Sequence, residues 1–138
     1  MSLIVSTGQA VDVGIAVRDI SRALWFYRDV LELEYLPVEH LPQGLELHRL
    51  CIGRSEVKLL AITPVPPAAN PPGGAFTATG YRYLTIRVGN VDEIVRACRT
   101  AGVHIHTEPF DSVTHPGERI AMVTDADGNL LEFVQQRA

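Results

Sequence analysis

The sequence predicts an α+β fold in which two βαβββ modules form a curled mixed sheet around a shared cleft. Two observations predict it. The apolar pattern repeats after 71 residues, and each copy changes from an alternating to a helical spacing. The shift superposes the apolar residues of the two opening strands, Val13, Ile15 and Val17 on Leu84, Ile86 and Val88.

Each module opens with a strand and a helix. Residues 11–17 and 82–88 alternate as strands with one apolar face do. Asp19 and Asn90 follow as expected N-caps, because a short side-chain oxygen can accept a free amide of the first helical turn. Apolar residues then recur at helical spacing, and Gly102 is expected to end the second helix in a left-handed conformation.

Three more strands are expected in each module, with the turn DADGN before the last one. Their expected ranges are 33–39, 45–52 and 55–62 in the first module, and 103–108, 118–124 and 130–135 in the second. The segment 63–80 carries five prolines and three glycines and is predicted to be a linker. The modules are thus 11–62 and 81–136 within one domain, 1–138, because neither is long enough for a stable core alone.

Composition excludes several classes of protein. With 46% hydrophobic and 20% charged residues, the chain is expected to fold. A net charge of −4 without a basic cluster argues against nucleic acid as a partner. No apolar run approaches the roughly 18 residues that span a bilayer, and no signal peptide is evident, so we expect a cytoplasmic location. Cys51 and Cys98 are expected to be packing residues rather than a disulfide.

Strand alternation selects four polar residues for the face opposite the helices. If the apolar sets lie under the helices, the cleft face receives Asp12, Lys58, Tyr83 and Glu132. Lys58 is the only lysine beside eleven arginines, and it interrupts an apolar strand. An ammonium group buried there would be costly unless it were paired.

Two stretches, VGIAVRDISRALWFYRDVLELE and DADGNLLEF, resemble the vicinal oxygen chelate superfamily. This superfamily includes glyoxalase I, methylmalonyl-CoA epimerase, extradiol dioxygenases, and fosfomycin and bleomycin resistance proteins. The resemblance covers about residues 10–135 and implies the repeated fold and the cleft. In metal-dependent members, one residue from each of the first, fourth, fifth and eighth strands holds the ion. The matching residues here are the four that alternation selects.

Together those four residues make a poor site for a divalent metal, although Glu132 is a good ligand and Asp12 a possible one, and no cofactor is predicted. A charged lysine offers no acceptor, and a tyrosine would have to lose a proton of pKa near 10. We expect Lys58 to take the place of the ion between Asp12 and Glu132, with the Tyr83 phenol donating to a carboxylate. The cluster is either a structural remnant or a centre in which Glu132 or Asp12 acts as a base and Lys58 stabilises an oxyanion.

Three further residues are candidates for substrate binding. His48 and Arg49 alternate on one strand, so one of them faces the cleft, and Arg119 is taken as the counterpart of Arg49 in the second module. An arginine there would favour a carboxylate or phosphate ligand, and a surface ion pair is the simpler alternative. His115 lies in a loop that could reach the cleft mouth as a proton shuttle. His104 and His106 are most simply explained by an exposed strand, although their spacing allows a metal pair.

The sequence therefore predicts a glyoxalase-like, bleomycin-resistance-like or dioxygenase-like protein for a small molecule, with a degenerate centre that holds no metal. Catalysis of proton transfer and simple ligand binding both stay open. The alternatives are a metal-dependent lyase or dioxygenase of the same superfamily and a non-catalytic resistance protein that sequesters its ligand. A homodimer is expected, with Trp25 or Phe26 exposed on the first helix.

Overall fold

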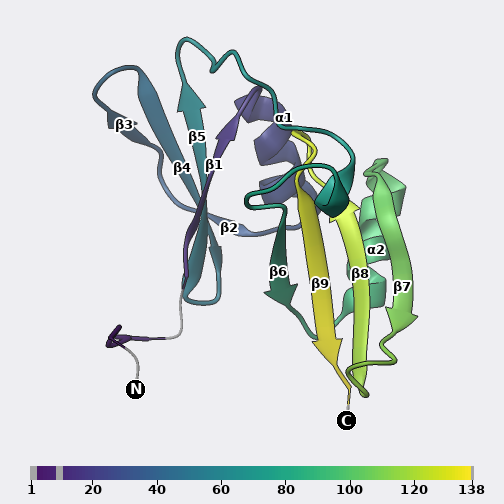
Figure 1. Ribbon diagram of the computed structural model, residues 1–138. Coiled ribbons are helices and arrows are strands. Elements are labelled where there is room, and N and C mark those ends of the chain that lie inside the picture. The colour runs from purple at the N-terminus through teal and green to yellow at the C-terminus, as the bar shows by residue number, and fades with distance from the viewer. Residues whose placement is uncertain (1–2, 9–10, 138) are drawn as a thin grey trace. The chain divides into compact units, whose positions relative to one another are not determined.

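The computed structural model describes residues 3–8 and 11–137 and contains two compact units (Figure 1). The first comprises Met1–Arg28 and Glu32–Pro66, and the second comprises Asp29–Leu31 and Pro67–Ala138. Each unit has its own mixed sheet, so the α+β class and the two βαβββ modules are confirmed. None of the described helices has the length and apolar character to cross a membrane.

The sheet of the first unit has the strand order β1-β5-β4-β2, and β3 also pairs with β4. These strands are β1 (Val13–Val17), β2 (Glu34–Tyr35), β3 (Glu39–Leu41), β4 (Leu45–Ile52) and β5 (Ser55–Ile62). β1 runs parallel to β5, and the other pairs are antiparallel. The single strand expected at 33–39 is wrong. Pro37 lies between β2 and β3, and proline has no amide to donate to a ladder.

The helical segment of the first unit begins as α1 (Ile20–Leu24) and continues as a π-helix, η1 (Trp25–Val30). Asp19 is the predicted N-cap, since its Oδ1 accepts the amides of Ser21 and Arg22 at 3.0 and 3.2 Å. The wider π turn brings both Phe26 and Tyr27 into the core, at 1% and 0% exposure, and leaves Trp25 at 38%. Trp25, rather than Phe26, is thus the exposed aromatic residue.

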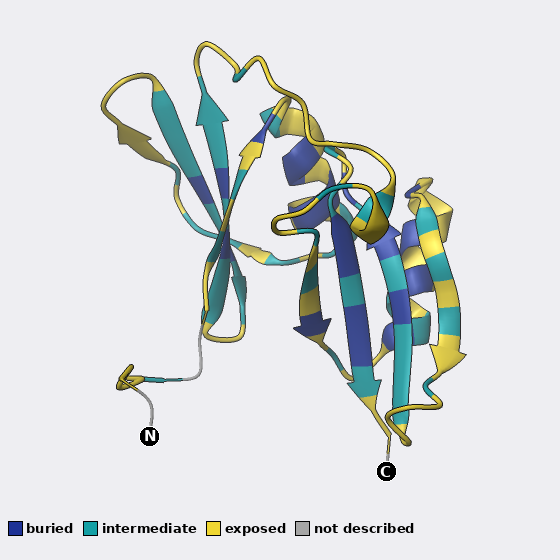
Figure 2. Cartoon of the chain, viewed as in Figure 1, coloured by how far each residue is buried: buried dark blue, intermediate teal, exposed yellow. Residues whose placement is uncertain are grey.

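The sheet of the second unit has the order β6-β9-β8-β7. Its strands are β6 (Tyr83–Arg87), β7 (Ile105–Asp111), β8 (Glu118–Thr124) and β9 (Leu130–Gln136), and α2 spans Val91–Ala101. The helical spacing places Val91, Val95 and Cys98 in the core, where burial raises the pKa of Cys98 to about 11. Figure 2 shows the resulting buried centre of β9 and β8 and the buried stripe on α2.

The two ends of α2 are closed differently. Gly102 ends the helix with φ 85°, as predicted. Asn90 precedes the helix but makes no capping bond. The amide of Val91 instead donates to Gln135 Oε1 at 2.9 Å, and Asn90 Nδ2 donates to Glu93 at 3.1 Å. The free amide is therefore satisfied from β9, which no local sequence pattern could indicate.

The segment 63–80 is more than a linker, because part of it is fastened to the second unit. It contains a short 3₁₀ helix, η2 (Gly74–Phe76). The Arg82 guanidinium donates to the carbonyl of Gly74 at 2.7 Å. Asn70 Nδ2 donates to the carbonyl of Asp127 and to Asn129 Oδ1, both at 3.1 Å. Side-chain donors thus hold this proline-rich chain in place without a regular ladder.

Gly102→Ala is expected to lower the free energy of unfolding by about 1–2 kcal/mol, because an L-residue is strained in the left-handed region. An added Cβ at Gly102 would meet nothing within 4 Å, so the loss would come from the backbone alone. Gly89→Ala is the matched control, since Gly89 is equally open and is not among the glycines with positive φ. Urea unfolding measures both variants, and equal losses would contradict the assignment of strain.

Candidate functional site

The register of the first sheet places Lys58 and Arg49 side by side on one face. Gly14 pairs with Lys58, and Lys58 pairs with Arg49. Val57 and Leu59, which flank Lys58 on β5, are 1% and 0% exposed, so their side chains point into the core on the opposite side. The alternation predicted for this strand is therefore present, and Lys58 lies on the face away from the core.

Lys58 forms an ion pair with Asp12, with 3.6 Å between Nζ and Oδ2. The other oxygen of Asp12, Oδ1, accepts the amide of Glu56 at 2.8 Å. This bond orients the carboxylate, so that both oxygens are engaged. The two side chains keep 37% and 40% of their exposure. The expectation of a buried ammonium is thus wrong, because the open face leaves Lys58 in partial contact with solvent.

Arg49, not His48, shares the face of Lys58. Its guanidinium lies 3.5 Å from Glu56 and 3.6 Å from Glu39, and its Nε is buried without a partner among the described residues. His48 points to the other side and is 7% exposed. Its Nδ1 lies 2.6 Å from the hydroxyl of Tyr35, so His48 is satisfied within the core.

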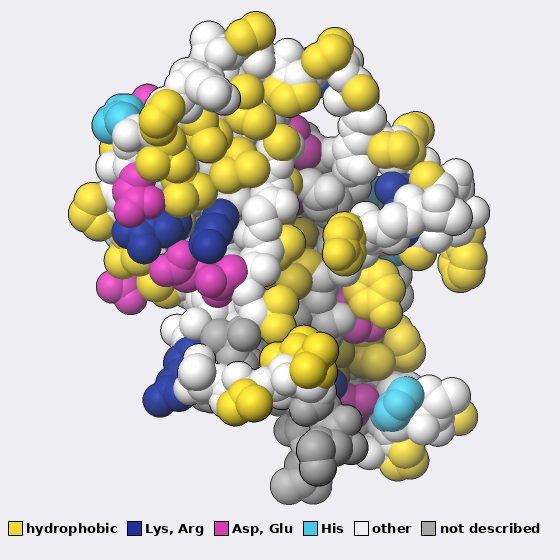
Figure 3. Space-filling model, turned by 60° about the vertical axis from the view of Figure 1, so that its left-hand side comes forward, with side chains coloured by type: hydrophobic (Ala, Val, Ile, Leu, Met, Phe, Trp, Pro, Cys, Tyr) yellow, Lys and Arg dark blue, Asp and Glu magenta, His cyan; other side chains and the backbone are white. Residues whose placement is uncertain are grey.

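The open face of the first sheet has a charged part and an apolar part. Beyond Lys58 and Arg49, the residues of the same parity on β5 and β4 are leucine and isoleucine: Leu60, Ile62, Leu47 and Leu45. All four are partly exposed. Figure 3 shows hydrophobic side chains gathered beside a group of basic and acidic ones on the side that it turns forward. Such a surface can contact both the apolar and the charged parts of a small molecule.

In the second unit, Glu132 receives a hydrogen bond from Thr85, with 2.7 Å between Thr85 Oγ1 and Glu132 Oε1. The two residues are cross-strand partners on β6 and β9. The expected donor, Tyr83, pairs with Leu130 instead and is 57% exposed. Sequence reasoning missed Thr85, although it has the parity of Tyr83. Strand alternation places Thr85 on the same face as Tyr83, but only the register shows which of the two lies opposite Glu132.

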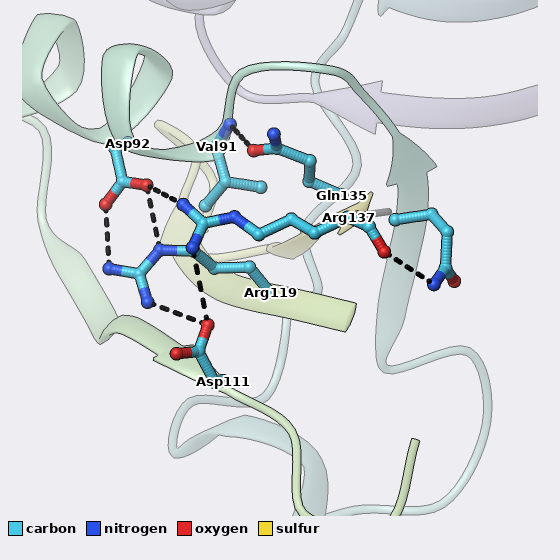
Figure 4. Close-up of polar contacts among 7 residues, drawn as sticks. Val91, Asp92, Asp111, Arg119, Gln135 and Arg137 are labelled. Carbon is cyan, nitrogen blue, oxygen red and sulfur yellow. Dashed lines mark hydrogen bonds and ion pairs between the residues drawn. The ribbon is translucent and has the colours of Figure 1, made fainter. Parts of the chain in front are cut away.

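Arg119 lies on the α2 side of its sheet and is fully engaged there (Figure 4). It donates to both carboxylate oxygens of Asp92 at 2.8 and 2.9 Å and to Asp111 at 3.1 Å. Arg137 Nη2 also donates to Asp92, at 3.2 Å. Of the two alternatives for Arg119, the structure therefore shows the ion pair rather than a side chain turned toward a ligand.

The presumed equivalence of Arg119 and Arg49 is also wrong. The residue opposite Glu132 is Met122, just as Arg49 is opposite Lys58. Arg119 therefore lies three residues earlier along β8 and has the opposite parity. Its carboxylate partners raise the pKa of its guanidinium, in keeping with a structural role.

The histidines of the second unit are exposed. His115 lies in the turn between β7 and β8, where its Nδ1 is 3.1 Å from Thr114 Oγ1. His104 precedes β7, because that strand begins at Ile105, two residues later than expected. His106 contacts the hydroxyl of Thr107 at 2.9 Å. The role of His115 as a proton shuttle stays a prediction.

The structure brings the predicted centre together in two parts. Asp12 and Lys58 are in contact in the first unit, and Tyr83 lies on the face of Glu132 in the second. That all four share one cleft stays a prediction. Over residues 3–8 and 11–137, no three His, Cys, Asp or Glu side chains form a group that could hold a metal ion. The donor set also fits a metal poorly, because the Lys58 ammonium would repel a cation beside Asp12.

The chain shows a family relationship over most of its length. The sequence model of the Glyoxalase/Bleomycin resistance protein/Dioxygenase superfamily matches residues 9–133. The chain belongs to this superfamily. No curated protein matches the sequence closely enough to add a relationship. The superfamily name covers a fold and several activities, so the chemistry has to be argued from the residues themselves.

Several solved structures share the fold of this chain. SMU.1112c has a TM-score of 0.76 at 22% identity, over 94% of this chain and 99% of its own. The glyoxalase I of Leishmania major, described as trypanothione-dependent, has a TM-score of 0.71 at 22% identity, over 94% of this chain and 88% of its own. TioX from Micromonospora sp. ML1 has a TM-score of 0.69 at 25% identity, over 94% of this chain and 99% of its own. These likenesses show the fold alone.

Acid is expected to weaken the second unit through Asp92. Arg119 holds the pKa of Asp92 below its ordinary value, chiefly by hydrogen bonding and also by its charge. A lowered folded pKa means that the stabilisation is complete above the unfolded pKa of about 3.9 and is lost as the pH falls through the folded value. The deficit of Asp92→Asn relative to the natural chain should therefore be largest near neutral pH and shrink below about pH 4.

Urea unfolding between pH 7 and pH 2 measures this dependence. The control is Glu108→Gln, which removes an exposed carboxylate paired with Arg99, both more than half exposed. We expect a smaller and flatter deficit for this variant, because exposed ion pairs contribute little. A deficit of Asp92→Asn that does not change with pH would contradict the predicted linkage.

Proposed function

We propose that this protein binds a small molecule at its open sheet faces without a divalent metal, and that Lys58 takes the place of a metal ligand. The observation that carries the proposal is the ion pair between Lys58 Nζ and Asp12 Oδ2 at 3.6 Å. The first unit thus already supplies a positive charge to the carboxylate that the superfamily resemblance assigns to a metal.

Electrostatics supports the proposal. An ammonium group has three donors and no lone pair, so it cannot ligate a cation and it repels one nearby. Asp12 has no spare oxygen either, since the amide of Glu56 occupies Oδ1 and Lys58 occupies the surroundings of Oδ2. A metal at this position would have to displace Lys58 and leave its charge unpaired on a partly buried strand.

Elemental analysis of protein purified without a histidine tag tests the proposal. We expect no stoichiometric Zn, Ni, Mn or Fe, and no rise in melting temperature when these ions are added. The comparison variant is Glu132→Ala, which removes the best metal ligand of the predicted centre. A stoichiometric metal that Glu132→Ala abolishes would refute the proposal and favour a metal-dependent lyase or dioxygenase.

A second candidate function is catalysis of proton transfer, with Glu132 as the base. The supporting observation is the bond from Thr85, which orients the carboxylate through Oε1 and leaves Oε2 without a partner in the described part of its unit. Asp12 is less suited to this role, because both of its oxygens are engaged. A base must be both oriented and free to accept a proton.

Deuterium exchange separates this candidate from simple sequestration. A panel of small α-hydroxy ketones in D₂O, followed by NMR, would report exchange of the proton next to the carbonyl. Exchange that is lost in Glu132→Gln and reduced in Thr85→Val would establish Glu132 as the base. A compound that binds without exchange would favour a sequestering protein.

A further inference from the structure

The open face of the first sheet is ordered in rows across its strands, and polarity changes from row to row. One row contains Glu56 and its partner on β4, Cys51, and the amide of Glu56 also donates to Asp12, just before β1. The next row contains Gly14, Lys58 and Arg49, which are consecutive partners on β1, β5 and β4. The two cations therefore lie in one row, directly beside the acidic row.

On β1, β5 and β4, the following rows are apolar. Ala16 pairs with Leu60, Leu60 pairs with Leu47, and Ile62 pairs with Leu45. The cations thus stand at the boundary between the acidic row and the apolar rows. A molecule lying on the leucines of β5 would meet Lys58 and Arg49 before Asp12 and Glu56, because these two carboxylates are one row further away. A third carboxylate, Glu39 on the short strand β3, pairs with Leu47 at the edge of the first apolar row and lies 3.6 Å from Arg49.

Small residues leave room above these rows on the β1 side. Gly14 and Ala16 are both exposed and stand beside Lys58 and Leu60. An added Cβ at Gly14 would come only within 4.0 Å of Leu60 Cδ1, which is an ordinary contact. A longer side chain at position 14 could therefore be accommodated by the fold and would cover the boundary between charged and apolar rows.

Arg49 is held much more loosely than the structural arginine of the second unit. Arg119 has three carboxylate contacts between 2.8 and 3.1 Å, whereas those of Arg49 are 3.5 and 3.6 Å. Charge-assisted bonds in proteins are about 2.7–2.9 Å long, so neither carboxylate satisfies Arg49 well. Its Nε is buried without a partner among the described residues, so Nη1 and Nη2 are the nitrogens left for a ligand. Arg49 can therefore gain from a better acceptor.

We propose that the ligand of this face is an amphipathic anion, whose carboxylate or phosphate group contacts Arg49 and Lys58 and whose apolar body lies on Leu47, Leu60 and Ile62. The inference rests on the proposed ligand binding and names its chemical class. The anion replaces the long contacts of Arg49 by short ones, and the apolar body covers leucine side chains that are otherwise exposed to water.

Calorimetric titration with octanoate, octanol, octylamine and acetate tests this class. Octanoate carries both features, octanol lacks the charge, octylamine reverses it, and acetate lacks the apolar body. We expect saturable binding of octanoate, with at least tenfold weaker binding of the other three probes. Loss of one charge-assisted hydrogen bond is sufficient for this ratio with octanol and octylamine, and loss of the buried methylene groups is sufficient with acetate.

Three variants locate the binding. Arg49→Gln should weaken octanoate about tenfold and leave octanol unchanged. Gly14→Leu should weaken both probes, because it covers the boundary between the rows. Arg87→Gln is the control, since Arg87 is a 74% exposed cation of the second unit with one carboxylate contact, at 3.4 Å. The Arg87→Gln variant should bind octanoate with the affinity of the natural chain.

Octylamine or octanol binding as tightly as octanoate would overturn the anionic class. If Gly14→Leu still abolished the binding of octylamine or octanol, the proposal that this face binds a ligand would stand. Only the assignment of the ligand to the anions would then be wrong. No saturable binding of octanoate, or equal affinity in Arg49→Gln, would also overturn the inference. Loss of octanoate binding as the protein associates at higher concentration would assign the apolar rows to a second copy of the chain instead.

Discussion

Phe133→Ala is expected to lower the free energy of unfolding by about 3–5 kcal/mol, the largest loss that we predict for a single truncation. Phe133 is 2% exposed at the centre of its sheet, where it pairs with Ile86 on one side and Ala121 on the other. Removing the ring takes away apolar burial and leaves a cavity that the surrounding strands can fill only in part. The total free energy of unfolding of a small domain is only about 5–15 kcal/mol.

The matched control is Phe76→Ala, which makes the same chemical change at a side chain that is 101% exposed. It should alter the free energy of unfolding by less than about 0.5 kcal/mol. Urea unfolding followed by circular dichroism measures both variants. Losses of similar size would mean that the burial of Phe133 in the second unit is not realised in solution.

Lys58→Glu is expected to create a binding site for a divalent cation in the first unit. In the natural chain, the Lys58 ammonium lies 3.6 Å from Asp12 Oδ2. The carboxylate that replaces this ammonium would stand beside Asp12 Oδ2, on the same face as Glu56. Without metal, the variant should lose about 1 kcal/mol or less, because an exposed ion pair is replaced by repulsion. Mn²⁺ at a hundredfold excess over its dissociation constant should then add about 2.7 kcal/mol.

Thermal unfolding with and without Mn²⁺ measures this change. Lys58→Gln is the control, because it removes the ammonium without adding a carboxylate and should gain no comparable stabilisation from the metal. Equal stabilisation of the natural chain by Mn²⁺ would show that Lys58 does not exclude a cation. That outcome would count against the metal-free proposal as well.

Most of the fold could be predicted from the sequence, because periodicity reports which side of a strand or helix is apolar. The strand ranges 45–52, 55–62 and 118–124 agree with the structure, as do the N-cap at Asp19 and the end of α2 at Gly102. Each of these features depends on a residue's own backbone preference or on its immediate neighbours. Local patterns of this kind are visible in one dimension.

The errors share a different cause, which is register and packing between distant segments. Gln135 closes α2 from 44 residues away, and Thr85 reaches Glu132 across 47. The π-helix that buries Phe26 leaves no simple mark in the apolar spacing. Arg119 was assigned to the wrong face because its counterpart was chosen by sequence position, whereas the strand pairs put Met122 opposite Glu132.

The sequence by itself determined the repeat, the two sheets and the face on which Lys58 lies, since these follow from alternation along single strands. Only the tertiary structure decided which charges meet. It paired Lys58 with Asp12, gave Arg49 two loose carboxylates, and bound Arg119 to Asp92. Ion pairs and hydrogen bonds depend on distances of a few tenths of an ångström across strands, and those distances are set by register and packing rather than by composition.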